Sequence, residues 1–553
     1  MRKTTLAILF FFALNVVAQW TPNPSVNTPV SVSLKVQQKV HIASDALNGA
    51  VMVWEDSRNS STNSTDIYAD RLNSSGYSKW SLNGLAVCSN GATQKSPVIT
   101  EAGNGAVIIA WQDNRNGNYD IYAQKIDSSG NALWTNGGIV VCNKTTNQQS
   151  PKLIGDNAGG AIIVWEDSLN FYWDISAQRI DANGTAVWLV NGVSVCNAAN
   201  NQNNPRIDIG GNGGAIITWQ DKRNNSDYDI YAQSLDASGV AGWTMNGVVI
   251  CNSINTQSNP KIEPDGSNGA LIAWEDKRNA LDYDIYAQRV SSLGVVQWAA
   301  NGIAVAAAGS NQSAPEMKYV GGNNLCISWK DIRSGSYAIY TQMLNLSGSP
   351  LLAANGVQLS SSLKSINPNN IADGNGGVII AWQDSTSSGW NISSQKLNSL
   401  GQIQWGNGGI VVSNAVNDQI NVTQVEDGFG GAIFAWEDKR NSTDYDIFAH
   451  KIYANGTSIS SVKESAGDAL VTVSCFPNPV NPTSVIQIKN NKRAVWNLTI
   501  YDSFGRLMET ATISNSDSYH LSSVYGAGVY FYSVFVSGVQ GNINGKFIYA
   551  SHD

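Results

Sequence analysis

The chain has 553 residues, of which only 14% are charged, and its formal net charge is −8. This length leaves room for several ordinary domains. Nucleic-acid-binding proteins carry a clustered basic face, so the acidic balance argues against that class and we expect no nucleic-acid partner.

The first 18 residues have the features of a secretory signal peptide. A positive start at residues 2–3 precedes an apolar run at residues 6–14, which is too short to span a bilayer. Residues 16–18 end in a small side chain, which predicts cleavage before Gln19. A membrane anchor and a buried strand are the alternatives. We expect no membrane span after cleavage, because no later stretch is long and apolar enough.

A tryptophan followed two residues later by an aspartate recurs eight times. The successive tryptophans lie 57, 54, 54, 55, 55, 53 and 54 residues apart. This regular spacing indicates a repeat architecture. The tryptophans are Trp54, Trp111, Trp165, Trp219, Trp274, Trp329, Trp382 and Trp436. The aspartates are Asp56, Asp113, Asp167, Asp221, Asp276, Asp331, Asp384 and Asp438.

Each repeat contains signals for four short strands and no competing helical period. In the third repeat we expect strands at residues 151–154, 161–165, 174–180 and 186–195, separated by glycine-rich turns. Four strands per repeat predict an all-β fold, a β-propeller in which each repeat forms one blade. A β-solenoid normally has a shorter repeat, and a string of separate sandwiches needs a longer one.

The eighth repeat supplies three strands, and its fourth is missing after Gly456. A segment at the other end of the chain, Trp20 followed by residues 27–32, resembles the missing strand. We therefore expect the N-terminal strand to complete the last blade, which leaves no open edge strand. The predicted domain is a closed eight-bladed propeller over residues 19–460.

The repeat also resembles the blade of TolB-like propellers. In residues 108–122 an Asp-x-Arg turn is followed by an Asp-Ile-Tyr strand, as in that family. The resemblance implies the propeller fold and no particular activity, since such propellers mostly bind other proteins or serve as scaffolds.

After residue 460 the period ends and another set of motifs begins. In order, these are a Pro-Asn-Pro opening, a Tyr-Asp-x-x-Gly-Arg turn, a Gly-x-Tyr strand and a closing lysine. The set resembles the type A C-terminal sorting domain of the type IX secretion system, which we predict for residues 461–553. Its motif residues are Pro477, Asn478, Pro479, Gly505, Gly528, Tyr530 and Lys546.

This resemblance implies a small Ig-like β-sandwich. It also implies export by way of the periplasm and across the outer membrane of a Bacteroidota-type bacterium. The type IX secretion machinery is then a partner, and the protein is secreted or held at the cell surface. An ordinary Ig-like accessory domain is the alternative.

An arginine stands two residues after six of the eight repeated aspartates, and Leu169 and Thr386 replace it in the third and seventh repeats. A calcium loop is one interpretation, since Ca²⁺ prefers carboxylate oxygens. An arginine inside the loop repels a cation, however. We expect bidentate Asp–Arg pairs that lock the turn, with no metal and no cofactor. The arginines are Arg58, Arg115, Arg223, Arg278, Arg333 and Arg440.

Trp173 and Trp390 depart from the repeat, because most other units have tyrosine at this position. They belong to the two repeats that lack the arginine. We predict them as candidate binding residues for a sugar ring or a protein partner, and drift in a repeat that lost its ion pair is the alternative. The regularly repeated tryptophans are expected in the core.

Four cysteines, Cys88, Cys142, Cys196 and Cys251, occupy equivalent positions in successive repeats. Equivalent positions in stacked sheets lie about 10 Å apart, whereas a disulfide needs Cα atoms within about 7 Å. We therefore expect buried thiols and no disulfides.

No catalytic constellation is visible in the sequence. The four histidines form no metal-ligand spacing, and the acidic residues are spread evenly over the repeats. A glycosidase needs two carboxylates that face one bond. We therefore predict a secreted or cell-surface binding or adhesion propeller, without catalysis, whose ligand is an extracellular polysaccharide or protein. A glycosidase or sialidase-like enzyme and a structural surface component are the alternatives.

Overall fold

The computed structural model describes residues 20–60, 64–169 and 171–458 of the repeat region. In the C-terminal region it describes residues 472–476, 484–489, 495–502, 506–514, 516–521, 528–536 and 542–549. The predicted signal peptide lies outside these residues. The chain divides into two compact units, Met1–Ile459 and Ser460–Asp553. Apart from one short 3-10 turn, Gly211–Gly213, the regular elements of the described residues are strands.

Each repeat forms one antiparallel four-stranded sheet. The first sheet has the order β2 (Gln37–Ser44), β3 (Ala50–Asp56), β4 (Asp66–Leu72), β5 (Leu85–Cys88). Every residue of β3 and β4 is buried, because neighbouring sheets cover both faces of these strands.

The next six sheets repeat this order. The second and third consist of β6 (Gln94–Glu101), β7 (Val107–Asp113), β8 (Asp120–Ile126) and β9 (Ile139–Cys142), then β10 (Gln148–Gly155), β11 (Ala161–Leu169), β12 (Tyr172–Ile180) and β13 (Val193–Cys196). The fourth and fifth consist of β14 (Gln202–Ile209), β15 (Ala215–Asp221), β16 (Asp229–Leu235) and β17 (Val248–Cys251), then β18 (Gln257–Pro264), β19 (Ala270–Asp276), β20 (Asp284–Val290) and β21 (Ile303–Ala306). The sixth and seventh consist of β22 (Gln312–Gly321), β23 (Asn324–Asp331), β24 (Ala338–Asn345) and β25 (Val357–Gln358), then β26 (Ser365–Ala372), β27 (Val378–Thr386), β28 (Gly389–Leu397) and β29 (Ile410–Ser413).

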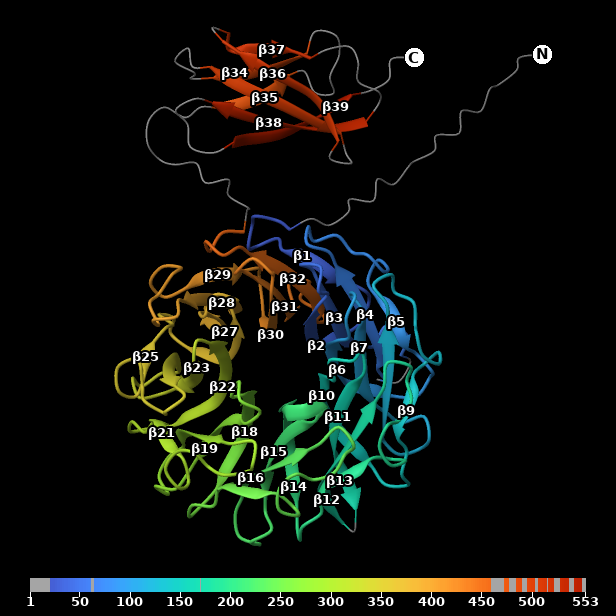
Figure 1. Cartoon of the computed structure of the whole chain (residues 1–553), viewed down its shortest axis with the longest axis vertical. Helices are drawn as coiled ribbons and strands as arrows, with labels where there is room; N and C mark the ends of the chain where they lie inside the picture. Colours follow the sequence, from blue (N-terminus) through green and yellow to red (C-terminus); the bar gives the residue numbers. More distant parts are fainter. Residues whose placement is uncertain are drawn as a thin grey trace, which may run out of the picture. The chain divides into compact units, whose positions relative to one another are not determined.

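The last sheet of the ring joins the two ends of the repeat region. It contains β30 (Gln419–Glu426), β31 (Ala432–Asp438), β32 (Asp446–Ile452) and, from the N-terminus, β1 (Thr28–Ser31). β1 pairs antiparallel with β32, and β30 packs beside β2 of the first sheet. Figure 1 shows the sheets of this unit arranged in a ring with β2, β6, β10, β18, β22 and β30 towards its centre. The all-β propeller fold and its closure by the N-terminal strand are therefore confirmed.

Tryptophans in the outer loops tie most sheets to the next one, and the sixth sheet has Leu352 at this position instead. The indole Nε1 of Trp134 donates to the carbonyl oxygen of Ala182, 3.2 Å away in the following sheet. Trp20 makes the same bond to Ser74, at 2.9 Å, across the junction between the last sheet and the first. The N-terminal segment thus supplies both the strand and the tryptophan that the eighth repeat lacks.

The fourth strand of the third sheet is shorter than predicted. In the third sheet the prediction placed it at residues 186–195, but only β13 is a strand. Ala186 forms an isolated bridge to Ile180, and Trp188 lies in the loop that follows. The Asn191-Gly192 turn separates the two parts, because both residues adopt a positive φ, 64° and 86°.

The core lies between the sheets rather than inside any one of them. One hydrophobic cluster joins Ile108 and Ile121 of the second sheet to Ile163 and Trp165 of the third. The eight repeated tryptophans are 0% exposed. A single repeat has nothing to cover these side chains, so the sheets depend on one another for stability. The cysteines Cys88, Cys142, Cys196, Cys251 and Cys326 are buried and free.

The second unit contains two sheets. One has the order β33 (Thr472–Phe476), β34 (Val485–Lys489), β37 (Ser518–His520), and the other has the order β36 (Leu507–Ile513), β35 (Trp496–Asp502), β38 (Gly528–Val536), β39 (Asn542–Tyr549). Ile486 of the first sheet and Trp496 of the second belong to one buried cluster. The finer prediction of an Ig-like domain stays a prediction.

The sorting-motif residues fall partly on these strands. Gly528 and Tyr530 lie on β38, and Lys546 lies on β39. The predicted motif residues Pro477, Asn478, Pro479 and Gly505 lie outside the described residues. No helix within the described ranges has the length and apolar character needed to cross a bilayer.

Candidate functional site

The repeated Asp-x-Arg turn is an ion-pair lock in the wall of the ring. Asp276 accepts hydrogen bonds from Trp274 Nε1 at 2.8 Å and from Arg278 Nε and Nη2 at 2.9 and 2.6 Å. The Arg278 guanidinium lies 3.7 Å from the centre of the Tyr286 ring. Ion pairs of the same kind join Arg58–Asp56, Arg115–Asp113, Arg223–Asp221, Arg333–Asp331 and Arg440–Asp438.

Hydrogen bonds within the lock favour the charged form of its carboxylate, as Asp113 shows. Burial raises the pKa of Asp113, but hydrogen bonds from Arg115 and Trp111 outweigh burial and hold the pKa below its usual value. Within the described parts of the chain, no group of three or more His, Cys, Asp or Glu side chains is placed to hold a metal ion.

The third and seventh sheets replace the arginine in different ways. Lys144, from the loop after β9, places its Nζ 2.5 Å from Asp167 Oδ2. Asp384 instead accepts from Ser365 Oγ at 2.5 Å and from Trp382 Nε1 at 2.8 Å. In both sheets the second and third strands continue to pair beyond the repeated aspartate, where the other sheets have the Asp-x-Arg turn. The strands β11, β12, β27 and β28 therefore each have nine residues.

Trp173 and Trp390 lie on these extended hairpins, in different sheets of the ring. Both are half-buried. The Trp173 amide donates to Asn201 Oδ1 at 3.0 Å, and the Tyr119 amide makes the same bond to Asn147 in the second sheet. The backbone at this position therefore serves the junction between sheets. A role of Trp173 and Trp390 in binding stays a prediction.

The first strand of each sheet carries a bulge. The pairing of β2 with β3 shifts between Gln38 and His41, and Lys39 inside this bulge has a φ of 56°. Its amide donates to Glu437 Oε1 of the preceding sheet at 2.8 Å. The bulge residues of the other sheets have φ between 52° and 57°, and they are Ser96, Ser150, Asn204, Asn259, Ala314, Asn367 and Asn421.

The residue that pairs first after each bulge lies at the same level of the ring. His41 pairs with Val53 at this position, and Glu316 pairs with Ser328. We call the space around the ring axis the channel and these residues the channel ring. The channel ring consists of His41, Val98, Lys152, Arg206, Lys261, Glu316, Asn369 and Thr423.

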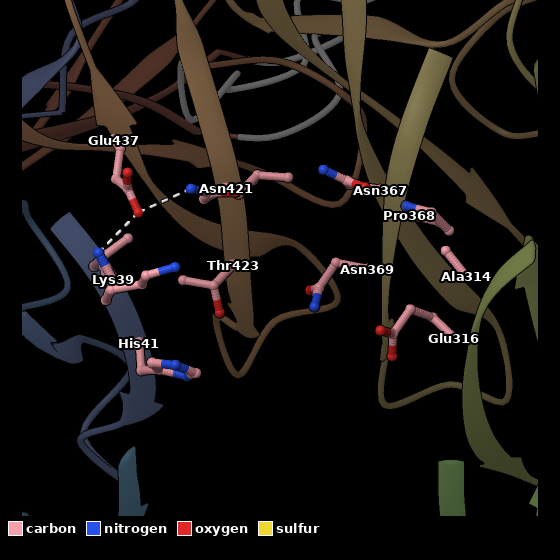
Figure 2. Close-up of a pocket in the computed structure, with 12 residues that line it drawn as sticks. Lys39, His41, Ala314, Glu316, Asn367, Pro368, Asn369, Asn421, Thr423 and Glu437 are labelled. Carbon is pink, nitrogen blue, oxygen red and sulfur yellow. Dashed lines mark hydrogen bonds between the residues drawn. The ribbon is translucent and has the colours of Figure 1, made fainter. Parts of the chain in front are cut away.

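A cavity of about 400 Å³ occupies one side of the channel. Figure 2 shows His41, Glu316, Asn369 and Thr423 around this cavity, on strands of the first, sixth, seventh and eighth sheets. Glu437 lies at its edge, where Oε1 accepts from the Lys39 amide and from Asn421 Nδ2, the latter at 3.0 Å (Figure 2). The rest of its lining combines the amides of Asn367 and Asn421 with Lys39 and four apolar residues, so polar and apolar groups both face the cavity.

Four consecutive sheets place a charged side chain in the channel ring. These are Lys152, Arg206, Lys261 and Glu316. Lys261 and Glu316 form an ion pair with each other. The positive charge of Lys152, after the effect of burial, lowers the pKa of His41 in the cavity wall. The charged part of the ring and the cavity therefore share one electrostatic environment.

A second layer of charge lies two residues further along three of these strands. It contains Asp208, Glu263 and Lys318, and Lys318 Nζ lies 3.0 Å from Glu263 Oε2. Burial raises the pKa of Asp208 to about 6. Burial also raises the pKa of Glu263 to about 7, although Lys318 opposes this shift.

The sequence prediction does not single out the channel ring. Its signal is present, however, because the position that follows the Pro of the first strand changes from repeat to repeat while its neighbours recur. Lys152, Arg206, Lys261 and Glu316 all directly follow a proline.

The family of secretion system C-terminal sorting domains matches residues 474–549. This match supports export through the type IX secretion system, to the medium or to the cell surface. No curated protein matches the chain.

Solved structures similar to the chain include a protein of unknown function from Dyadobacter fermentans, at 10% identity and a TM-score of 0.38, with 67% of this chain and 98% of that chain covered. Another is a PL25 ulvan lyase, at 10% identity and a TM-score of 0.38, with 81% and 97% covered. A third is an endo-arabinase from Bacteroides thetaiotaomicron, at 13% identity and a TM-score of 0.30, with 56% and 95% covered. These likenesses carry no argument about activity.

Proposed function

We propose that the protein is an exported binding propeller that holds an extracellular ligand in its channel, without catalysis of its own. The sorting domain supports delivery to the outside of a Bacteroidota-type cell. The channel ring supports a ligand site in the channel. The residue type at the channel-ring position differs from sheet to sheet, whereas the side chains of the surrounding wall recur.

The polar groups of the cavity favour a saccharide over a wholly apolar ligand. Asn367, Asn369, Asn421 and Thr423 line it with amide and hydroxyl groups, and the lining also includes charged and apolar side chains. Neutral polar groups of this kind bind sugar hydroxyls by hydrogen bonds and do not need a charged ligand.

The test is to probe the purified protein against an array of glycans and matrix proteins and to assay bound glycans for cleavage. We expect retention without product. Thr423→Val and Asn369→Leu, which remove polar groups from the cavity, should lower retention by tenfold or more. Thr512→Val, on an exposed position of the second unit, is the control and should leave retention unchanged.

Three results would contradict parts of this proposal. Release of product would favour a carbohydrate-active enzyme. Retention that survives both cavity substitutions would move the ligand away from the channel. No retention on any surface, together with self-association of the protein on a sizing column, would favour a structural surface component.

A further inference from the structure

Three successive sheets carry a cation in the channel ring, but only one of these cations is neutralised there. Lys261 pairs with Glu316. Among the described residues, no carboxylate oxygen lies within 4.0 Å of Lys152 or Arg206. Their hydrogen bonds go to the prolines that precede them: Lys152 Nζ donates to Pro151 O at 3.2 Å, and Arg206 Nη1 donates to Pro205 O at 3.0 Å.

Sequence on the same strands explains why Lys152 stands out. Two residues after Arg206 comes Asp208, and two residues after Lys261 comes Glu263, so β14 and β18 each carry an acid in the second layer, although neither acid forms an ion pair with the cation of its own strand. β10 has Ile154 at this position. Lys152 is therefore the cation of the channel ring whose strand supplies no opposite charge in the second layer.

Glu166 is the acid that acts electrostatically on both cations, but its oxygens are engaged elsewhere. Oε1 accepts from the Asn204 amide at 2.7 Å, and Oε2 accepts from Gln149 Nε2 at 2.9 Å. These bonds hold the carboxylate in the junction between the third and fourth sheets. Glu166 reduces the positive potential around Lys152 and Arg206 without forming an ion pair with either.

Burial, together with the remaining positive potential, disfavours the charged form of Lys152. Burial lowers the pKa of Lys152 to about 7, and the charges of Arg206 and Lys261 add to this effect while Glu166 opposes it. Burial also lowers the pKa of Arg206, against the charges of Glu316 and Glu166. The charged forms of Lys152 and Arg206 are both disfavoured in the free protein. A bound anion would stabilise them.

We propose that Lys152 and Arg206 bind the acidic group, carboxylate or sulfate, of an anionic saccharide that occupies the channel. This inference rests on the proposed function and names the class of its ligand. The planar guanidinium of Arg206 suits a two-point bond to such a group, and Lys152 adds a point charge beside it. The amides and hydroxyl of the cavity wall are then available for the neutral hydroxyls of the same chain.

The test is calorimetric titration of the purified full-length protein with three oligosaccharides of equal length. One contains uronic acid, one is sulfated and one is neutral. We expect the acidic ligands to bind at least tenfold more tightly than the neutral one, and the stronger of the two identifies the acidic group. Lys152→Met and Arg206→Met should each weaken acidic binding by tenfold or more. Lys222→Met is the control, because it removes the same charge from the turn after β15, where Lys222 lies near Tyr228.

The pH dependence separates a binding role from a structural one. Lys152 loses its charge as the pH rises through about 7, so affinity for the acidic ligand should fall between pH 6 and pH 8. At pH 8 binding should take up a proton, which appears as a binding enthalpy that depends on the buffer. Lys152→Arg should keep the affinity and lose the part of both effects that Lys152 causes, since arginine stays charged. Asp208 and Glu263, whose pKa values burial raises to about 6 and about 7, should leave only a smaller fall in affinity over the same range. Lys152→Met should also raise the melting temperature of the free protein, because a disfavoured cation is removed.

Several outcomes would overturn this inference. Equal affinity for neutral and acidic oligosaccharides would refute the anion site and leave a channel ligand in place. Acidic binding that survives both Lys152→Met and Arg206→Met would place the acidic group elsewhere. Retention of acidic proteins with no binding of acidic saccharides would refute the ligand class. No binding of any glycan or protein would refute the proposed function and this inference together.

Discussion

In the wall between neighbouring sheets the same side chains recur in nearly every repeat, whereas in the channel ring no two neighbouring sheets carry the same side chain. A wall residue such as Trp274 is 0% exposed and is fixed by contacts on both sides. A channel residue such as Asn369 is only half-buried and lines the cavity. Packing therefore determines which side chains the wall can have. It places little constraint on the channel-ring side chains, which are free to vary with the ligand.

One buried wall position breaks the pattern, and it shows how strictly the wall is specified. Six sheets have glutamine in the middle of their third strand, where Gln124 donates from Nε2 to Thr135 O at 2.8 Å and accepts from the Trp134 amide at 3.1 Å. The first sheet has Asp70 there, whose Oδ2 has no hydrogen-bond partner. The glutamines are Gln124, Gln178, Gln233, Gln288, Gln342 and Gln395.

The largest expected effect on stability comes from breaking one of the Asp–Arg ion pairs in the wall. Asp276→Asn keeps the shape of the side chain but leaves Arg278 without its anion. Removing one partner of a buried ion pair is strongly destabilising, and Arg278 keeps some contact with water, so we expect a loss of about 2–3 kcal/mol in the free energy of unfolding. Urea unfolding followed by tryptophan fluorescence measures this loss.

The seventh sheet supplies the matched control. Asp384 is equally placed but has no arginine, so Asp384→Asn keeps an acceptor for Trp382 Nε1 and leaves no cation unpaired. We expect a loss of less than about 1 kcal/mol, as for a substitution that leaves a hydrogen bond in place. Equal losses for Asp276→Asn and Asp384→Asn would show that the ion pair adds nothing to the wall.

Asp70→Gln should make the wall regular and stabilise the protein near neutral pH. Burial raises the pKa of Asp70 from 3.8 to about 6. The folded state therefore holds this proton more tightly than the unfolded chain, and stability falls as the pH rises from about 4 to about 6. A shift of two units corresponds to about 3 kcal/mol. We expect a gain of up to this size at pH 7 and almost none at pH 4.

The reverse substitution in the second sheet tests the same cause. Gln124→Asp should destabilise the protein at pH 7 and recover stability at pH 4. Burial lowers the pKa of His450 in the last sheet to about 4, so its protonation also reduces stability in acid. Each variant is therefore compared with the unaltered protein at the same pH. A gain from Asp70→Gln that is the same at both pH values would contradict the assigned protonation.

The sequence is sufficient to predict the sheets because the wall is periodic. Regular tryptophans and glycine-rich turns specify each blade, and Trp20 even predicts which strand closes the ring. The lock in the third sheet was not predictable, since Lys144 reaches Asp167 from a loop 23 residues earlier. The channel ring escaped prediction for another reason. Its residues are recognised as neighbours only once the first strand of each sheet is known to be the innermost one.

The smallest expected effect concerns the bulge of the sixth sheet. Ala314 has a φ of 52°, whereas four of the equivalent bulge residues are asparagine, namely Asn204, Asn259, Asn367 and Asn421. A left-handed backbone costs an ordinary L-residue about 1–2 kcal/mol, and asparagine tolerates it better. We therefore expect Ala314→Asn to raise the free energy of unfolding by about 0.5–1 kcal/mol, because part of this cost is removed.

The matched reverse change, Asn259→Ala, should lower the free energy of unfolding by a similar amount or more, since it also removes the bond from Asn259 Nδ2 to Glu275 at 2.8 Å. A loss of stability in Ala314→Asn would mean that the neighbouring Lys330, which offers no acceptor, sets the preference at this bulge instead of the backbone.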